Sequence, residues 1–211
     1  MQSIDSFSAD KESEIPSEFE YLSTLRRAWL NESRCPEILR FETDAVSEVK
    51  AWLRENRESS VGRDFAELIL LNNDRVEYVL KAYLRSRLFK IQSNFMYYLR
   101  KEREKLSSSE LRFAQSLEDI SAGHFHSSFL HCLPGEEVFQ SISNESDPAG
   151  SMIRRPDLNS WVLTEVIERV GRFTIGSGSD SHELDLDIGG VHLVKYADIR
   201  PLVITGKLTL V

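Results

Sequence analysis

The feature that most constrains the fold is a stretch of 44 residues, 63–106, that contains neither glycine nor proline. Apolar residues recur through it at spacings of three and four, from Phe65 to Leu99, as one face of a helix requires. A helix of about 40 residues would be roughly 60 Å long. A compact chain of 211 residues has a radius of gyration of only about 17 Å. We therefore expect this helix either to be kinked or to extend along a partner molecule.

Shorter helices are predicted on both sides of the long one. The spacing from Ser17 to Glu20, and again from Ser107 to Glu110, is that of a capping box, in which each side chain satisfies a backbone donor left free at a helix start. Another helix should begin near Asp44. The residues expected to end these three helices are breakers or poor helix formers: Asn31 and Pro36, Ser59 to Gly62, and Pro134 with Gly135.

The hydrophobic pattern changes in the C-terminal third. Residues 134–151 are rich in Pro, Gly, Ser, Asn and Asp and are predicted to form a linker. From Met152 the apolar period becomes two, along residues 161–166, 184–188 and 208–211, which is typical of β-strands, and turns are expected at 176–179 and at Gly189 and Gly190. We therefore predict an α+β protein with an N-terminal all-α helical bundle, one very long helix and a small C-terminal β-rich domain. The expected parts are an acidic flexible tail at 1–16, the helical domain at 17–133, the linker at 134–151 and the β-rich domain at 152–211.

Charge and cysteine content exclude several classes of protein. The net charge is −8, from 26 basic and 34 acidic residues, whereas domains that mainly contact phosphates are usually basic. Two cysteines are too few for a disulfide scaffold, and no apolar run approaches the roughly 20 residues that span a bilayer. The N-terminal residues are acidic and polar, unlike a signal or transit peptide. We expect a soluble intracellular protein without a membrane segment.

No catalytic, cofactor or metal site is expected from the sequence. Asp185 and Asp187 should lie about 6.6 Å apart on one face of a strand, where paired carboxylates can do acid–base work, but the exposed face of an ordinary strand has the same pattern. The stretch Gly176–Ser181 lacks the Lys-Ser/Thr of a phosphate-binding loop and is expected to be a turn. Zinc chelation on one helix requires ligands at i and i+4, which the following neighbours do not provide: His124, His126, His131 and Cys132.

Seven basic residues crowd the second half of the long helix and the segment after it. They could contact nucleic acid, form a solvated face that complements the dipole at the helix C-terminus, or make salt bridges with another chain. The pattern favours the solvated face and leaves the other two interpretations open. The residues are Arg85, Arg87, Lys90, Arg100, Lys101, Arg103 and Lys105.

The same half of the helix carries more apolar side chains than one packing neighbour needs. Phe89, Met96 and Tyr97 lie about 100° from the main apolar stripe. They are either buried between two helices of this chain or cover a partner subunit, and the length of the helix favours the partner. The candidate interface residues on this helix are Leu84, Leu88, Phe89, Ile91, Phe95, Met96, Tyr97 and Tyr98.

Four segments of the chain resemble subunits of the GINS complex: Ala28–Leu39, Asp74–Gln92, Pro156–Val162 and Lys195–Val211. The order of a helical domain before a small β domain is similar to that of the subunit for which the "go" (five) in the acronym stands. The likeness extends from about Tyr21 to Val211. Its most specific part is the combination of the Y-L-R-x-R-L-x-K-I block with the C-terminal block.

The resemblance implies a non-catalytic scaffold, without cofactors, in a heterotetramer with the three other GINS subunits. With the minichromosome maintenance ring and a RecJ-like partner, this family forms the replicative (CMG) helicase, which acts in initiation and elongation of DNA replication in the nucleus. The resemblance also allows contacts with a polymerase and with a replisome hub, and it implies that direct DNA binding is weak or absent. The β domain of the family docks within the tetramer, a role carried over here to Tyr196, Ile199, Leu202, Leu208 and Leu210.

The N-terminal tail departs from the family pattern. Some relatives carry a short acidic–apolar motif there that binds a trimeric replisome hub. Only Ile4, Asp5 and Phe7 approximate that motif here, and its D-I-L-like core is missing. We therefore do not expect hub binding through this tail.

Three other functions remain open from the sequence. A stand-alone helical adaptor unrelated to replication would be a monomer. An enzyme that uses Asp185 and Asp187 would respond to a metal ion or a substrate. A sister GINS subunit with the same domain order would share the overall pattern, although the complete C-terminal block argues against it.

Overall fold

The computed structural model describes residues 17–59, 65–132, 153–176 and 181–211, so the predicted tail at 1–16 and linker at 134–151 lie outside the described residues. Helices come first and a small β region follows, which confirms the predicted α+β class. The helical elements are α1 (Ser17–Arg34), α2 (Thr43–Ser59), α3 (Ala66–Lys101), η1 (Arg103–Lys105), α4 (Ser108–Ser128) and η2 (Leu130–Cys132). The β region contains β1 (Trp161–Val166), β2 (Gly171–Ile175), β3 (His182–Leu186), β4 (Val191–Lys195), α6 (Tyr196–Ile204) and β5 (Leu208–Leu210).

The long helix forms, and it is kinked. α3 has 36 residues, and Asn94 interrupts it with a non-helical backbone (φ −136°, ψ 35°). Of the two expectations for the long helix, a kink or a partner molecule, the kink is therefore present, and it divides the helix into two shorter segments. The predicted capping box at Ser107 is also confirmed, since its hydroxyl accepts from Glu110 N–H and the Glu110 carboxylate accepts from Ser107 N–H.

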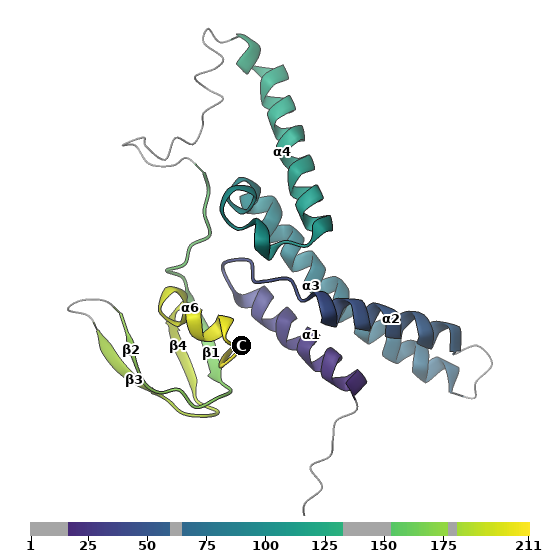
Figure 1. Ribbon diagram of the computed structural model, residues 1–211, viewed down its shortest axis with the longest axis vertical. Helices are drawn as coiled ribbons and strands as arrows, with labels where there is room; N and C mark the ends of the chain where they lie inside the picture. The colour runs from purple at the N-terminus through teal and green to yellow at the C-terminus, as the bar shows by residue number, and fades with distance from the viewer. Residues whose placement is uncertain (1–16, 60–64, 133–152, 177–180) are drawn as a thin grey trace, which may run out of the picture.

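Two apolar clusters hold the helices together. The first joins α1, α2 and the first part of α3 and includes Leu25, Val46, Val49, Leu80 and Tyr83. The second joins the loop after α1 to the end of α3 and the start of α4, through Ile38, Ile91, Tyr98, Leu99 and Ala114. α4 then extends away from the other helices (Figure 1), and most of its side chains after residue 117 are exposed.

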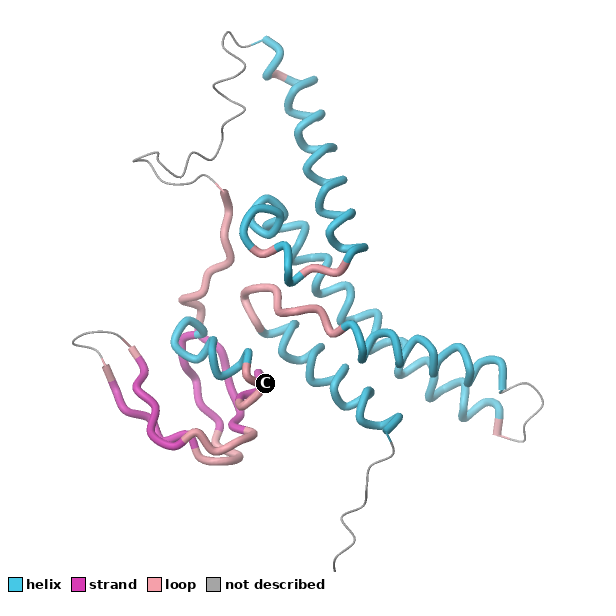
Figure 2. Tube along the Cα trace, in the orientation of Figure 1, coloured by secondary structure: helices cyan, strands magenta, loops and turns pink. Residues whose placement is uncertain are grey.

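The β region has two antiparallel sheets and one helix (Figure 2). The larger sheet has strand order β4-β1-β5, and β2 pairs with β3 in a hairpin. One face of the larger sheet is buried: along β1, residues 162, 164 and 166 point inward and residues 161, 163 and 165 point outward. The hairpin and α6 pack against this inner face in a core that includes Val162, Val194, Ile199, Leu208 and Leu210.

The helix α6 was not predicted from the sequence. Tyr196, Ile199 and Val203 are buried at helical spacings of three and four, so a periodic signal was present. Pro201 lies inside the helix. Because proline usually ends a helix and the surrounding sequence has the period-two pattern of strands, the helical spacing was not recognised. The strands β2 and β4 were also missed, whereas the turn expected at Gly189 forms, with a positive φ of 77° that favours glycine.

Candidate interaction surfaces and the domain junction

Arg87 lies at the centre of the helical region and is completely buried. Its guanidinium bonds both carboxylate oxygens of Glu110, at 2.7 and 3.1 Å, and one oxygen of Glu32 at 3.1 Å. It also donates to the carbonyls of Leu39 (2.7 Å) and Lys105 (2.9 Å). These five contacts match the five N–H donors of a guanidinium, so no donor is left unsatisfied in the interior. The planar group thereby joins α1, α3, α4 and two connecting segments.

Lys90 extends the same network toward the loop after α1. Its ammonium lies 2.7 Å from a carboxylate oxygen of Glu32 and also contacts the carbonyls of Glu32 and Glu37. Lys105 continues it from η1, with contacts to Glu37 at 2.8 Å and Glu102 at 3.1 Å. The favoured interpretation of the basic residues as a solvated face is therefore wrong for Arg87, Lys90 and Lys105, because all three form ion pairs inside the chain. The sequence did not reveal the pairs because their acidic partners lie far away along it.

Glu37 joins the helical region to the β region. Its carboxylate accepts from the Tyr196 hydroxyl at 2.7 Å, from Arg200 at 2.6 and 2.7 Å, and from Lys105 at 2.8 Å. Burial alone would raise the pKa of this carboxyl, but the donors from Arg200, Lys105 and Tyr196 outweigh burial and hold its pKa below the ordinary 4.5. The group is therefore charged at neutral pH, and that charge is fully compensated.

The network as a whole, called the charged cluster below, contains four cations and four carboxylates. Buried charges are tolerated only when they are paired and hydrogen-bonded, and here the two signs balance. The cluster consists of Arg87, Lys90, Lys105 and Arg200 with Glu32, Glu37, Glu102 and Glu110.

Two further contacts seal the junction between the helical and β regions. The side-chain oxygen of Asn31, on α1, accepts from Leu210 N–H at 2.8 Å and from the Thr209 hydroxyl at 2.9 Å. This amide therefore closes the edge of β5. Cys35, which follows α1, is buried in the core of the β region, and burial raises the pKa of its thiol to about 11.

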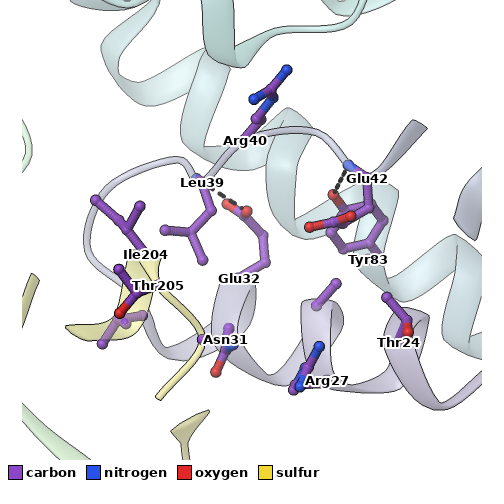
Figure 3. A pocket seen from close by; sticks show the side chains of 13 residues that line it. Thr24, Arg27, Asn31, Glu32, Leu39, Arg40, Glu42, Tyr83, Ile204 and Thr205 are labelled. Carbon is purple, nitrogen blue, oxygen red and sulfur yellow. Dashed lines mark hydrogen bonds between the residues drawn. The ribbon is translucent and has the colours of Figure 1, made fainter. Parts of the chain in front are cut away.

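A cleft of about 300 Å³ opens at the same junction, between α1, the loop after it and the end of α6. Arg27, Arg40, Glu32 and Glu42 are among its lining residues (Figure 3), so both signs of charge line the cleft. Tyr83 closes its floor, with its hydroxyl accepting from Glu42 N–H at 3.3 Å, and burial raises the pKa of that hydroxyl to about 12. Among its lining residues we find no pairing of a nucleophile with a general base. We interpret the cleft as the boundary between the helical and β regions.

Six of the thirteen candidate interface residues are buried in the chain itself. Fully buried side chains offer no surface to a partner, so only the other seven residues remain candidates for an interface. The buried six are Ile91 and Tyr98 in α3, and Tyr196, Ile199, Leu208 and Leu210 in the β region; Leu202 is half-buried there.

The remaining candidates lie on α3. Phe89 is 71% exposed and Leu88 is 39% exposed, and other large apolar side chains of the same helix, such as Tyr78, are exposed as well. The half-buried candidates are Leu84, Phe95, Met96 and Tyr97. Ile120 and Phe125 on α4, and Phe129 directly after it, are exposed beyond the contact of α4 with α3. These positions form exposed apolar surface on the helical region.

A second apolar surface was not singled out from the sequence. The outer face of the β4-β1-β5 sheet, called the outer sheet face below, is formed by Trp161, Leu163, Val191, Leu193 and Val211, all of them exposed. The alternation along β1 was recognised, but the sequence does not say which of its two faces is covered. The indication that could have located it is that both faces of β1 begin with large apolar residues.

The remaining chemical candidates are on the surface. Asp187 forms an exposed ion pair with Arg169 at 3.1 Å, and Asp185 is exposed in β3. His131 contacts Cys132 at 3.2 Å, but no group of three or more His, Cys, Asp and Glu side chains within the described ranges could hold a metal ion. None of the helices described combines the length and hydrophobicity needed to cross a membrane.

Comparison with known proteins places both regions in one family. Residues 45–129 match the family described as GINS complex protein helical bundle domain, and residues 156–211 match the DNA replication complex GINS protein SLD5 C-terminus. Three relatives named DNA replication complex GINS protein SLD5 illustrate the range. The protein of Mus musculus is 30% identical over 206 residues, covering 91% of this chain and 89% of the relative. That of Chaetomium globosum is 30% identical over 211 residues, with 93% of each covered. That of Arabidopsis thaliana is 28% identical over 198 residues, with 89% of each covered.

The matches agree with the order of domains seen here, with helices first and the small β region second. They also extend over nearly the full length of both this chain and its relatives. The chain therefore belongs to the family of DNA replication complex GINS protein SLD5.

Proposed function

We propose that this chain is a non-catalytic scaffold subunit of the heterotetrameric GINS complex. The observation that carries the proposal is the similarity to SLD5 proteins along 91% of the chain, through both the helical and the β region. The subunit would help to assemble the replicative helicase with the minichromosome maintenance ring and the RecJ-like partner. It would act in the nucleus, in initiation and elongation of DNA replication.

The exposed apolar side chains of α3 and α4 support a scaffold role. Phe89 and Ile120 are each about 70% exposed, at 71% and 69%, and Leu88 lies beside Phe89. Exposed apolar surface of this kind marks interfaces with other proteins. We assign these helical positions to contacts with sister subunits, together with the half-buried Leu84, Phe95, Met96 and Tyr97.

The charged cluster supports the same role by fixing the shape of the subunit. It joins the loop after α1 to α3, α4 and α6 with bonds that involve eight buried or half-buried charged side chains. A scaffold needs surfaces held in a constant relative position. Paired and hydrogen-bonded charges of this kind favour one arrangement over others.

The test is co-expression of this chain with three sister GINS subunits, followed by size exclusion and light scattering. The proposal predicts one stoichiometric complex with a mass near the sum of the four chains. A 24.2 kDa monomer that ignores all three subunits would contradict it and would favour a stand-alone adaptor. The matched variant is Phe89→Asp, which should leave the chain folded and reduce assembly.

A further inference from the structure

The two edges of the β4-β1-β5 sheet differ. The β5 edge is closed, because Asn31 on α1 accepts from Leu210 N–H at 2.8 Å. On the other side, β4 is the terminal strand in the sheet order. Exposed sheet edges can template pairing with another chain, so natural proteins usually cover them or place charges and prolines along them. β4 carries a single charged residue, Lys195, at its end, and no proline.

The hydrogen bonds between β4 and β1 identify the free backbone groups. Tyr196 N–H donates to Ser160 O, and Val166 N–H donates to Gly190 O. In an antiparallel pair, alternate residues direct both backbone groups to the partner strand and the residues between them direct both away. With the register of β1 and β4, His192 and Val194 face β1. The N–H and C=O groups of the three residues that alternate with them therefore point away from the sheet: Val191, Leu193 and Lys195.

The side chains of these same three residues lie on the outer sheet face. Leu193 is 62% exposed and Val191 is 55% exposed, and the strand register places them beside Leu163 and Glu165 of β1. Trp161, also 62% exposed, lies next to Lys195. Open backbone groups and an uncovered apolar face thus occur together on one strand.

The ends of this surface have opposite charge. The Lys195 ammonium lies 5.7 Å from the centre of the Trp161 ring, and Glu165 stands opposite Val191 at the other end. Among the described residues, neither Lys195 nor Glu165 has an ion-pair partner. A bound strand with a carboxylate near Lys195 and a cation near Glu165 would match both.

We infer that the β4 edge receives an extended segment of another subunit of the assembly as an additional strand. The segment would carry apolar side chains at alternating positions, to cover Leu193 and Trp161, and an acidic residue toward Lys195. Main-chain hydrogen bonds would supply affinity, and the alternating side chains would supply specificity. This inference rests on the proposed function, since assembly supplies the additional strand.

The test compares amide hydrogen exchange, residue by residue, in the isolated full chain and in the complex purified after co-expression. We expect the amides of Val191, Leu193 and Lys195 to exchange at least about 100-fold more slowly in the complex, because they gain hydrogen bonds. The amides of His192 and Val194 serve as the internal control, since they already bond β1 and should be protected in both samples.

Two variants separate backbone pairing from side-chain contact. Leu193→Pro removes an outward N–H, which edge strands tolerate, whereas Leu193→Ala shortens the side chain and keeps the N–H. We expect the proline variant to lose protection at Val191 and Lys195 in the complex, and the alanine variant to keep most of it. Slow labelling of the buried Cys35 would show that both variants still fold.

The outcomes distinguish failure of this inference from failure of the proposed function. If a complex of four subunits forms and the three outward amides exchange as fast as before, the strand-addition inference is overturned and the proposed function stands. If no complex forms, both are overturned. If protection appears in the isolated chain and grows with concentration, the added strand comes from a second copy of this chain, and the inference is again overturned.

Discussion

The interior of the molecule around the junction differs from its outer surfaces. In a soluble monomer, charged side chains are usually exposed and large apolar side chains are usually buried, and here both kinds of exception occur. Charged side chains such as Glu37 at the junction and Arg87 in the helical region beside it are buried. Large apolar side chains such as Phe89, Trp161 and Leu193 are exposed outside it. Lys, Arg, Asp and Glu are seldom buried unless paired. The comparison suggests that polar bonds fix the internal geometry of this chain and that apolar surfaces connect it to other chains.

The largest expected effect comes from breaking the charged cluster at its centre. Arg87→Ala should destabilise the chain by about 3–5 kcal/mol, because it leaves Glu110 buried without its cation and leaves Glu32 with Lys90 alone. Urea unfolding of the isolated chain measures this effect. Arg85→Ala is the matched control, since Arg85 is exposed on the same helix and should change stability by less than about 0.5 kcal/mol. Equal effects in the two variants would contradict the account of the cluster.

A smaller effect is expected where the cluster meets the β region. Glu37→Gln removes the charge that accepts from Tyr196, Arg200 and Lys105, and should cost about 2–3 kcal/mol because hydrogen bonds to charged groups are the stronger ones. The reaction rate of Cys35 with a thiol reagent reports it, because that thiol is buried in the core of the β region. We expect faster labelling of Cys35, while the exposed Cys132 reacts at an unchanged rate. Glu104→Gln, at an exposed position of η1, is the control.

The hydrogen bond between Asn31 and the β5 edge should contribute less to the free energy of unfolding. Asn31→Ala leaves the N–H of Leu210 without its acceptor, for which we expect a loss of about 1–2 kcal/mol. Asn56→Ala, on α2, removes only a local bond to the Trp52 carbonyl and serves as a control. If Asn31→Ala left both urea unfolding and Cys35 labelling unchanged, the contact with β5 would not help to hold the two regions together.

The smallest effect is a dependence on pH. The folded pKa of Glu37 is lowered, so its stabilising contribution is complete above the ordinary 4.5 and is lost as pH falls through the folded pKa. The difference in unfolding free energy between the native chain and Glu37→Gln should be constant well above the ordinary pKa of 4.5 and should shrink as the pH falls below it. Other carboxyl groups titrate in both proteins and cancel. A difference that grows on acidification would have the wrong sign.

Much of the helical region could be predicted because its signals are local. The apolar spacing in α3 and the capping box at Ser107 both act within a few residues, and both are present in the structure. The kink was expected only as one of two alternatives, since nothing local distinguishes Asn94 from the neighbouring polar residues. The resemblance to GINS subunits rests on whole blocks of sequence and did not need the contacts.

The charged cluster could not be predicted because its bonds join distant positions. Glu37 and Arg200 are 163 residues apart, and Glu32 and Arg87 are 55 apart. A sequence shows that these residues are charged, but it does not show which charges meet. The same limit applied to the interface, where helical phase alone could not tell the buried Ile91 from the exposed Phe89. The outer sheet face was missed because period-two alternation does not say which face is covered.

The most direct test of the central claim is light scattering on the complex co-expressed with Phe89→Asp, with urea unfolding of the same variant. We expect normal unfolding, because Phe89 is 71% exposed, together with loss of the four-subunit complex, because a charge would enter an apolar interface. Asn72→Asp adds the same charge on exposed surface about 25 Å away along α3 and should assemble normally. Full assembly of Phe89→Asp would contradict the claim that the exposed apolar surface of α3 joins this chain to its partners.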